Sequence, residues 1–138
     1  GLDRLIARGV PLTPAIQLAV LFAPLLLTRL EEALRRRGGS KQPSSEEIAD
    51  ALLFPIARRH SLARRDRDRV KRIVLSLRRM LTGELRRRAR HGGRLNKVVG
   101  RDYFREAIVL LWLHCRATSA GWDEFRYWEG KAKLRGNR

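Results

Sequence analysis

Cysteine is nearly absent from this sequence of 138 residues, in which Cys115 is the single thiol. One cysteine cannot form an internal disulfide, and it is too few to build a cysteine-based metal site. The composition therefore fits a reducing compartment, and we expect a cytoplasmic protein. Cys115 lies inside an apolar run, so we interpret it as a small core residue.

Acidic residues and lysine are scarce, while arginine is abundant. The chain has 31 cationic residues against 14 carboxylates, a net charge of +17, and only five of the cations are lysine. Self-repulsion of this size destabilises a compact chain, so we expect a polyanionic partner, nucleic acid first and an anionic membrane surface second. Arginine grips phosphate with two donors and stacks on bases. A GC-rich genome would also raise the arginine-to-lysine ratio, but it would not explain the net charge.

Patterns typical of β-strands are missing as well. No stretch alternates apolar and polar residues between turn signals, whereas apolar residues recur at helical spacing over most of the chain. We therefore predict an all-α, compact domain of about five to six helices without a β-sheet. A chain of this length can bury a real core.

Capping signals mark where the helices begin. Thr13 precedes a proline that suits the first helical position, and Ser44 forms a capping box with Glu47. The expected helices begin at or cover residues 2–8, 14–37, 45 onward, 64–81, 101–118 and 122 onward.

Proline and glycine mark where the helices bend or end. Pro24 is expected to kink the helix 14–37, and Pro55 to break or kink the helix that follows Ser44. Gly83 should end the helix 64–81, and Gly121 should separate the last two helices.

The longest apolar run is "PAIQLAVLFAPLLL", residues 14–27. It is shorter than the roughly 20 residues of a membrane span and contains a mid-run proline. We therefore predict a buried core helix and expect no membrane partner. The chain begins "GLDRLIARG", without Met, which suggests a piece of a longer protein.

Two short motifs are similar to parts of nucleotidyltransferase sites, but the expected helices argue against both. "GGS" at 38–40 follows a helix end, and "DRD" at 66–68 begins a helix, where residues i and i+2 point about 200° apart. The histidines, His60, His91 and His114, lack metal-ligand spacing. We therefore predict no catalytic residue, no metal site and no cofactor within this chain.

A basic helical face is the strongest candidate site. Val70, Ile73, Val74, Leu77 and Leu81 form an apolar stripe, and arginines recur every seven residues on the opposite side. Seven residues rise about 10.5 Å on a helix, so such a row could follow backbone phosphates. The alternative is an ordinary solvated face. The residues predicted to bind nucleic acid are Arg58, Arg59, Arg64, Arg65, Arg72, Arg79, Arg86, Arg87 and Arg90.

Aromatic residues could add stacking on unpaired bases. We expect Tyr103, Phe104 and Trp112 to lie in the core. Phe125 and Trp128 are spaced as a docking face, and Tyr127 is the ring expected to be exposed.

The order of these motifs resembles the C-terminal part of bacterial poly(A) polymerases, relatives of CCA-adding enzymes. "LDRLIARGVPLTPAIQLAVLFAPLL" is similar to that family's helix pair with a Phe-Ala-x-Leu-Leu pattern. "ARRHSLARRDRDRVKRI" resembles its Pro-Arg-Arg-Phe segment, "GRDYFREAIVLLWLHCRA" its Arg-Phe-Arg-Ala-Ala helix, and "WDEFRYWEGKAK" the aromatic segment that follows. Ala57 and His60 depart from the family's Pro and Phe.

The resemblance implies an RNA-binding fragment of an enzyme that adds AMP to RNA 3′ ends. Residues 1–121 would form the helical RNA-binding domain and residues 122–138 a C-terminal aromatic and basic segment. The catalytic domain, with ATP and Mg²⁺, would precede residue 1, and the partner of this chain would be the single-stranded 3′ end of RNA. The alternative is a helical DNA-binding or interaction domain unrelated to polymerases.

Overall fold

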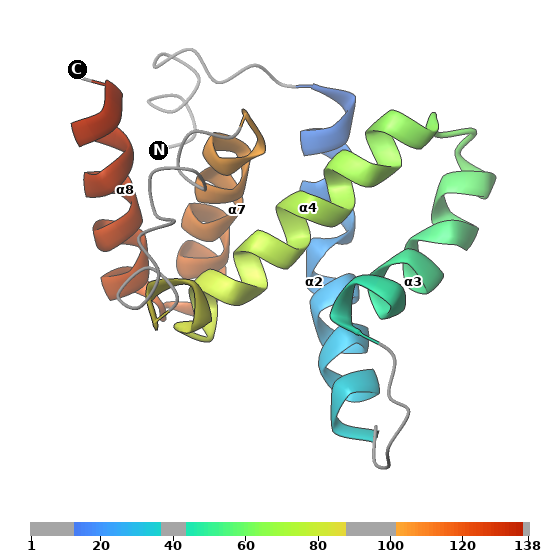
Figure 1. Cartoon of the computed structure of the whole chain (residues 1–138), viewed down its shortest axis with the longest axis horizontal. Coiled ribbons are helices and arrows are strands. Elements are labelled where there is room, and N and C mark those ends of the chain that lie inside the picture. Colours follow the sequence, from blue (N-terminus) through green and yellow to red (C-terminus); the bar gives the residue numbers. More distant parts are fainter. Residues whose placement is uncertain (1–12, 37–43, 88–101, 137–138) are drawn as a thin grey trace. The chain divides into compact units, whose positions relative to one another are not determined.

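The computed structural model describes residues 13–36, 44–87 and 102–136. About 89% of these residues are helical and none is in a strand, which confirms the predicted all-α class. The labelled helices in Figure 1 are α2 (Pro14–Arg36), α3 (Ser45–Arg59), α4 (Arg64–Leu81), α7 (Asp102–Thr118) and α8 (Trp122–Gly136). Residues 84–87 form a further helical turn. The helix predicted at residues 2–8 lies outside the described ranges.

The predicted helix starts rest on side-chain caps. The Thr13 hydroxyl accepts a hydrogen bond from the Ile16 amide at 3.2 Å, and the Ser44 hydroxyl accepts one from the Glu47 amide at 3.2 Å. Each hydroxyl satisfies an amide that has no partner inside its helix. Gly83 and Gly121 both have positive φ, which explains why helices end beside them.

Of the two expectations for Pro55, a break or a kink, the break is wrong, because α3 continues through this residue to Arg59. Pro24 likewise lies inside the continuous helix α2. A proline inside a helix removes one backbone hydrogen bond. Buried residues on both sides hold the helix in place, Ala23 and Leu26 around Pro24, and Leu53 and Ala57 around Pro55.

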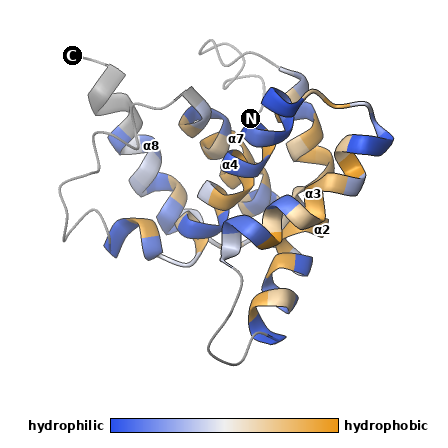
Figure 2. Cartoon of the chain, turned by 45° about the vertical axis from the view of Figure 1, so that its right-hand side comes forward, coloured by the Kyte–Doolittle hydropathy of each residue, from blue (hydrophilic) through white to orange (hydrophobic). Residues whose placement is uncertain are grey.

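Residues 13–75 form one compact unit, the α2–α3 unit, which includes the first part of α4. Its core contains Leu30 of α2, Ile48 and Ala49 of α3, and Leu75 of α4. The partly buried residues Ala33, Leu34 and Leu52 pack against this cluster. Figure 2 shows hydrophobic and hydrophilic residues alternating around these helices, as expected for helices with one face in a core.

Helix α2 has two apolar faces. Ala15, Ile16, Ala19, Ala23, Leu26 and Leu30 are buried, which confirms the predicted core helix. The other face exposes Val20, Leu21 and Leu25. By its length and composition α2 could cross a membrane. Of its most apolar stretch of 18 residues, 33% is buried. Core helices of soluble proteins satisfy the same criterion, so the absence of a membrane partner stays a prediction.

The described residues from 76 onward belong to the second compact unit, the α7–α8 unit. Helices α7 and α8 pack against each other, and their connection turns at Gly121 (Figure 1). Phe104 and Trp128 are fully buried and meet edge to face with their ring centroids 5.6 Å apart. The division between the compact units falls inside α4. The boundary expected between residues 121 and 122 stays a prediction.

We expect Gly121→Ala to destabilise the protein by roughly 1–2 kcal/mol, because φ is +88° and left-handed backbone is costly for alanine. The new Cβ would also lie 3.3 Å from Cys115 Sγ. Gly130→Ala is the matched control, since Gly130 is helical with open space around it and alanine should stabilise it by up to about 1 kcal/mol. Thermal melting of both variants tests this pair, and equal shifts would contradict it.

Candidate nucleic-acid interface

The predicted two-sided pattern of α4 is present. Val70, Ile73, Val74 and Leu77 are at most 2% exposed, and Leu81 is partly buried. On the opposite side Arg65 and Arg72 are exposed, and Arg79 is partly exposed. All three arginines lie on one continuous helix, so its pitch places them on one side. Each is about 10.5 Å along the helix axis from the next.

Burial on α4 extends further than the sequence suggested. Leu75, Ser76 and Met80 are buried in addition to the predicted stripe. Leu75 belongs to the core of the α2–α3 unit. Other parts of the protein therefore cover more than one face of α4 around its middle. Fewer residues beside Arg72 are exposed than the sequence pattern suggested.

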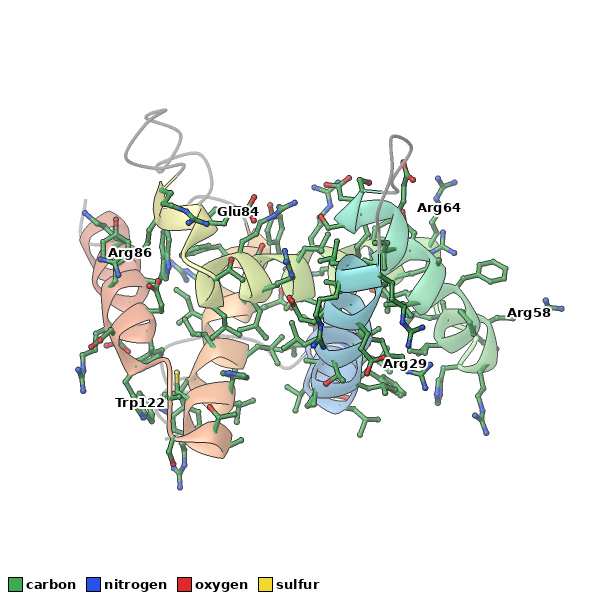
Figure 3. All side chains as sticks on the ribbon, turned by 90° about the horizontal axis from the view of Figure 1, so that it is seen from below. Arg29, Arg58, Arg64, Glu84, Arg86 and Trp122 are labelled. Carbon is green, nitrogen blue, oxygen red and sulfur yellow. The ribbon has the colours of Figure 1, made fainter. Side chains whose placement is uncertain are left out.

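The turn between α3 and α4 is flanked by arginines of both helices. Arg58 and Arg59 end α3, Arg64 and Arg65 begin α4, and all four side chains are exposed. The turn is tight, since the Leu62 amide donates to the Ala57 carbonyl at 2.8 Å. Figure 3 shows Arg58 and Arg64 in the same part of this unit.

Little negative charge offsets this cluster. Lys71 Nζ lies 3.2 Å from Asp50 Oδ1, so the Asp50 carboxylate already has a cationic partner. Among the described residues, no ion pair involves the following five arginines: Arg58, Arg59, Arg64, Arg65 and Arg72. We call these five residues the arginine cluster. Uncompensated guanidinium groups at an exposed corner are suited to binding phosphate.

Arg86 is placed differently from the cluster. Its Nη1 lies 3.1 Å from Glu124 Oε1, and its guanidinium carbon lies 4.0 Å from the centre of the Tyr127 ring. Lys131 Nζ lies 5.5 Å from the same ring, and Figure 3 shows Arg86 beside α8. Arg86 therefore has partners within the protein, Arg87 is exposed, and Arg90 lies outside the described residues.

The aromatic residues follow the prediction in part. Phe104 is buried as expected, whereas Tyr103 is only partly buried. Phe125 and Trp128 of the predicted docking face are buried. The ring of Tyr127, which was predicted to be exposed, is only partly exposed. Its centroid lies 4.9 Å from that of the Trp128 ring, and the Arg86 guanidinium lies over its face. His60 is exposed, with its ring centroid 5.6 Å from that of Phe22.

Trp112, which was predicted to be a core residue, is partly exposed. The guanidinium carbon of Arg116 lies 5.1 Å from the centre of its ring. The helical spacing of Arg105, Trp112 and Arg116 places the three on one side of α7.

The remaining candidates for chemistry are dispersed. Asp66 and Asp68 lie in the first turns of α4, where helical geometry points them apart. No group of three His, Cys, Asp or Glu side chains that could hold a metal ion occurs within the described part of the chain. The "GGS" motif and His91 lie outside that part. Burial raises the pKa of the Cys115 thiol, which disfavours the reactive thiolate.

Burial also lowers the pKa of His114 from its ordinary value of 6.5. The unfolded chain then binds this proton more readily than the folded one, so stability should fall as the pH falls through about 6.5. We expect His114→Gln to show a weaker loss of stability than the wild type between about pH 7.5 and pH 5. Urea denaturation across this range measures the effect, and parallel pH profiles would contradict it.

Comparison with known proteins identifies no relative: no family model, no curated protein and no solved structure matches the chain.

Proposed function

We propose that this chain binds single-stranded RNA through the arginine cluster. The observation that carries the proposal is the exposure of these five arginines with no ion pair within the described residues. A net charge of +17 on 138 residues adds a long-range attraction for any polyanion. Arginine also favours RNA over a simple anion, because its guanidinium plane stacks on unpaired bases as well as binding phosphate.

We further propose that the chain is the C-terminal, RNA-binding portion of a cytoplasmic poly(A) polymerase. The order of the sequence motifs and the all-α fold support this proposal. The chain would then hold the RNA 3′ end, while ATP and Mg²⁺ bind residues outside it. The described residues offer no group of three metal-binding side chains, so none of them is assigned to that ion.

Binding measured at several salt concentrations tests the proposal. We expect the affinity for single-stranded RNA to fall steeply with salt. Each phosphate contact should contribute about −0.7 to the slope of log affinity plotted against log salt concentration. Single-stranded RNA should bind at least as tightly as duplex DNA of the same length at equal salt. Tighter binding to one particular duplex DNA sequence would favour a DNA-binding domain instead, and binding independent of salt would reject the proposed surface.

A further inference from the structure

Helix α7 carries a second basic surface that includes a tryptophan. Arg105, Trp112 and Arg116 are separated by seven and four residues, so the helical repeat places them on one side of the helix. Along the axis, Trp112 is about 10.5 Å from Arg105 and about 6 Å from Arg116. We call these three residues the α7 stripe.

The residues of the α7 stripe are accessible at its two ends, while Ile108 and Val109 between Arg105 and Trp112 are buried. Phe104, Ala107, Leu111 and Cys115 are fully buried, and they anchor α7 in its unit. Arg105 and Arg116 are exposed, and Trp112 is partly exposed. Tryptophan is a large apolar group whose exposure is unfavourable without a partner, so its place between two exposed arginines favours a binding role.

Among the described side chains, no carboxylate forms an ion pair with Arg105 or Arg116. The acidic residues of α7 are Asp102 and Glu106, and Glu106 is 2% exposed. The guanidinium carbon of Arg116 lies 5.1 Å from the centre of the Trp112 ring. Both guanidinium groups can therefore donate hydrogen bonds to phosphate without breaking an ion pair to a described residue.

We propose that the α7 stripe is a base-stacking subsite for single-stranded nucleic acid. An unpaired base stacks on Trp112 or on the guanidinium plane beside it, while Arg105 and Arg116 bind the phosphates on either side. This inference rests on the proposed function, because it assumes that RNA binds to the chain. It adds a site that the arginine cluster does not include and gives a reason for single-strand preference, since paired bases have no free face to stack.

Substitutions at Trp112 separate stacking from charge. Trp112→Leu should weaken binding of single-stranded oligo(A) by roughly 5- to 150-fold, the range expected for the loss of one stacked base. It should leave the salt slope and the affinity for duplex RNA unchanged, because no phosphate contact is removed. Trp112→Phe keeps a ring, so it should retain most of the affinity while removing the part of the tryptophan fluorescence that RNA quenches.

Substitutions of the arginines test the phosphate contacts without altering the core. Arg105→Gln and Arg116→Gln should each flatten the salt slope by about 0.7 units. Trp122→Leu is the matched control, because Trp122 is also partly exposed in the same unit, where its ring contacts Phe125. It should keep the wild-type affinity, and thermal melting should confirm that all variants are folded.

The outcomes distinguish this inference from the function on which it rests. If the wild type shows no salt-dependent binding of single-stranded RNA, both proposals are overturned. If the wild type binds RNA, and Trp112→Leu and the two arginine variants bind it equally well, the α7 stripe alone is rejected. An equal loss of affinity in Trp112→Leu and Trp122→Leu would also reject it, because the effect would not be specific to this site.

Discussion

Replacing Leu77 by alanine should lower the free energy of unfolding by about 2–5 kcal/mol. Leu77 is 1% exposed in the middle of the apolar stripe of α4, next to the buried residues Val74 and Met80. Alanine removes buried methyl groups and leaves a cavity that the surrounding side chains fill only in part. Since a domain is stabilised by about 5–15 kcal/mol in total, this one change should be evident in a urea denaturation curve followed by circular dichroism.

Leu21→Ala is the control for this substitution. Leu21 is 67% exposed on α2, so its truncation should change stability by no more than about 0.5 kcal/mol. A similar loss in both variants would show that the burial of Leu77 does not account for its effect.

The slope of log RNA affinity against log salt concentration should become about two units less steep in a triple variant. This variant replaces Arg65, Arg72 and Arg79 by glutamine. The three residues share one side of α4, and each phosphate contact on a single strand contributes about 0.7 units. Between 50 and 200 mM salt, the wild type should therefore lose roughly 18-fold more affinity than the variant. Glutamine keeps good helix propensity, so the melting temperature should stay the same or rise slightly as self-repulsion falls.

A control with the same change in net charge shows whether the effect is local. Arg29, Arg35 and Arg36 are exposed on a different helix, α2, and can be replaced by glutamine in the same way. This second variant should lose less affinity and keep a steeper salt slope. If both triple variants behave alike, total charge rather than a particular face determines binding. If the α4 variant binds like the wild type, the arginines of α4 make no contribution.

Most of the helix boundaries could be predicted because they depend on residues close together in the sequence. The start of α4 at Arg64 and its end at Leu81 agree with the sequence pattern, and the caps at Thr13 and Ser44 form as expected. The error at Pro55 has a physical cause. The proline rule considers the lost backbone hydrogen bond, whereas buried residues on either side of Pro55 keep α3 helical.

Individual side chains were harder to predict than helices. Trp112 was assigned to the core because large aromatic residues are usually well buried, yet it is partly exposed beside Arg116. Tyr127 was expected to be exposed, but Arg86 and Trp128 lie against its ring. In both cases the answer depends on neighbours in space, which helical periodicity does not identify when several faces of a helix are covered.

The sequence by itself determined the all-α class, most ends of the described helices and the excess of positive charge, because capping, periodicity and composition act locally or sum over the chain. The tertiary structure alone decided which cations are compensated. Lys71 pairs with Asp50, 21 residues away, and Arg86 pairs with Glu124, 38 residues away. Ion pairs need an approach within about 4 Å, and only the packing of helices brings such distant residues that close.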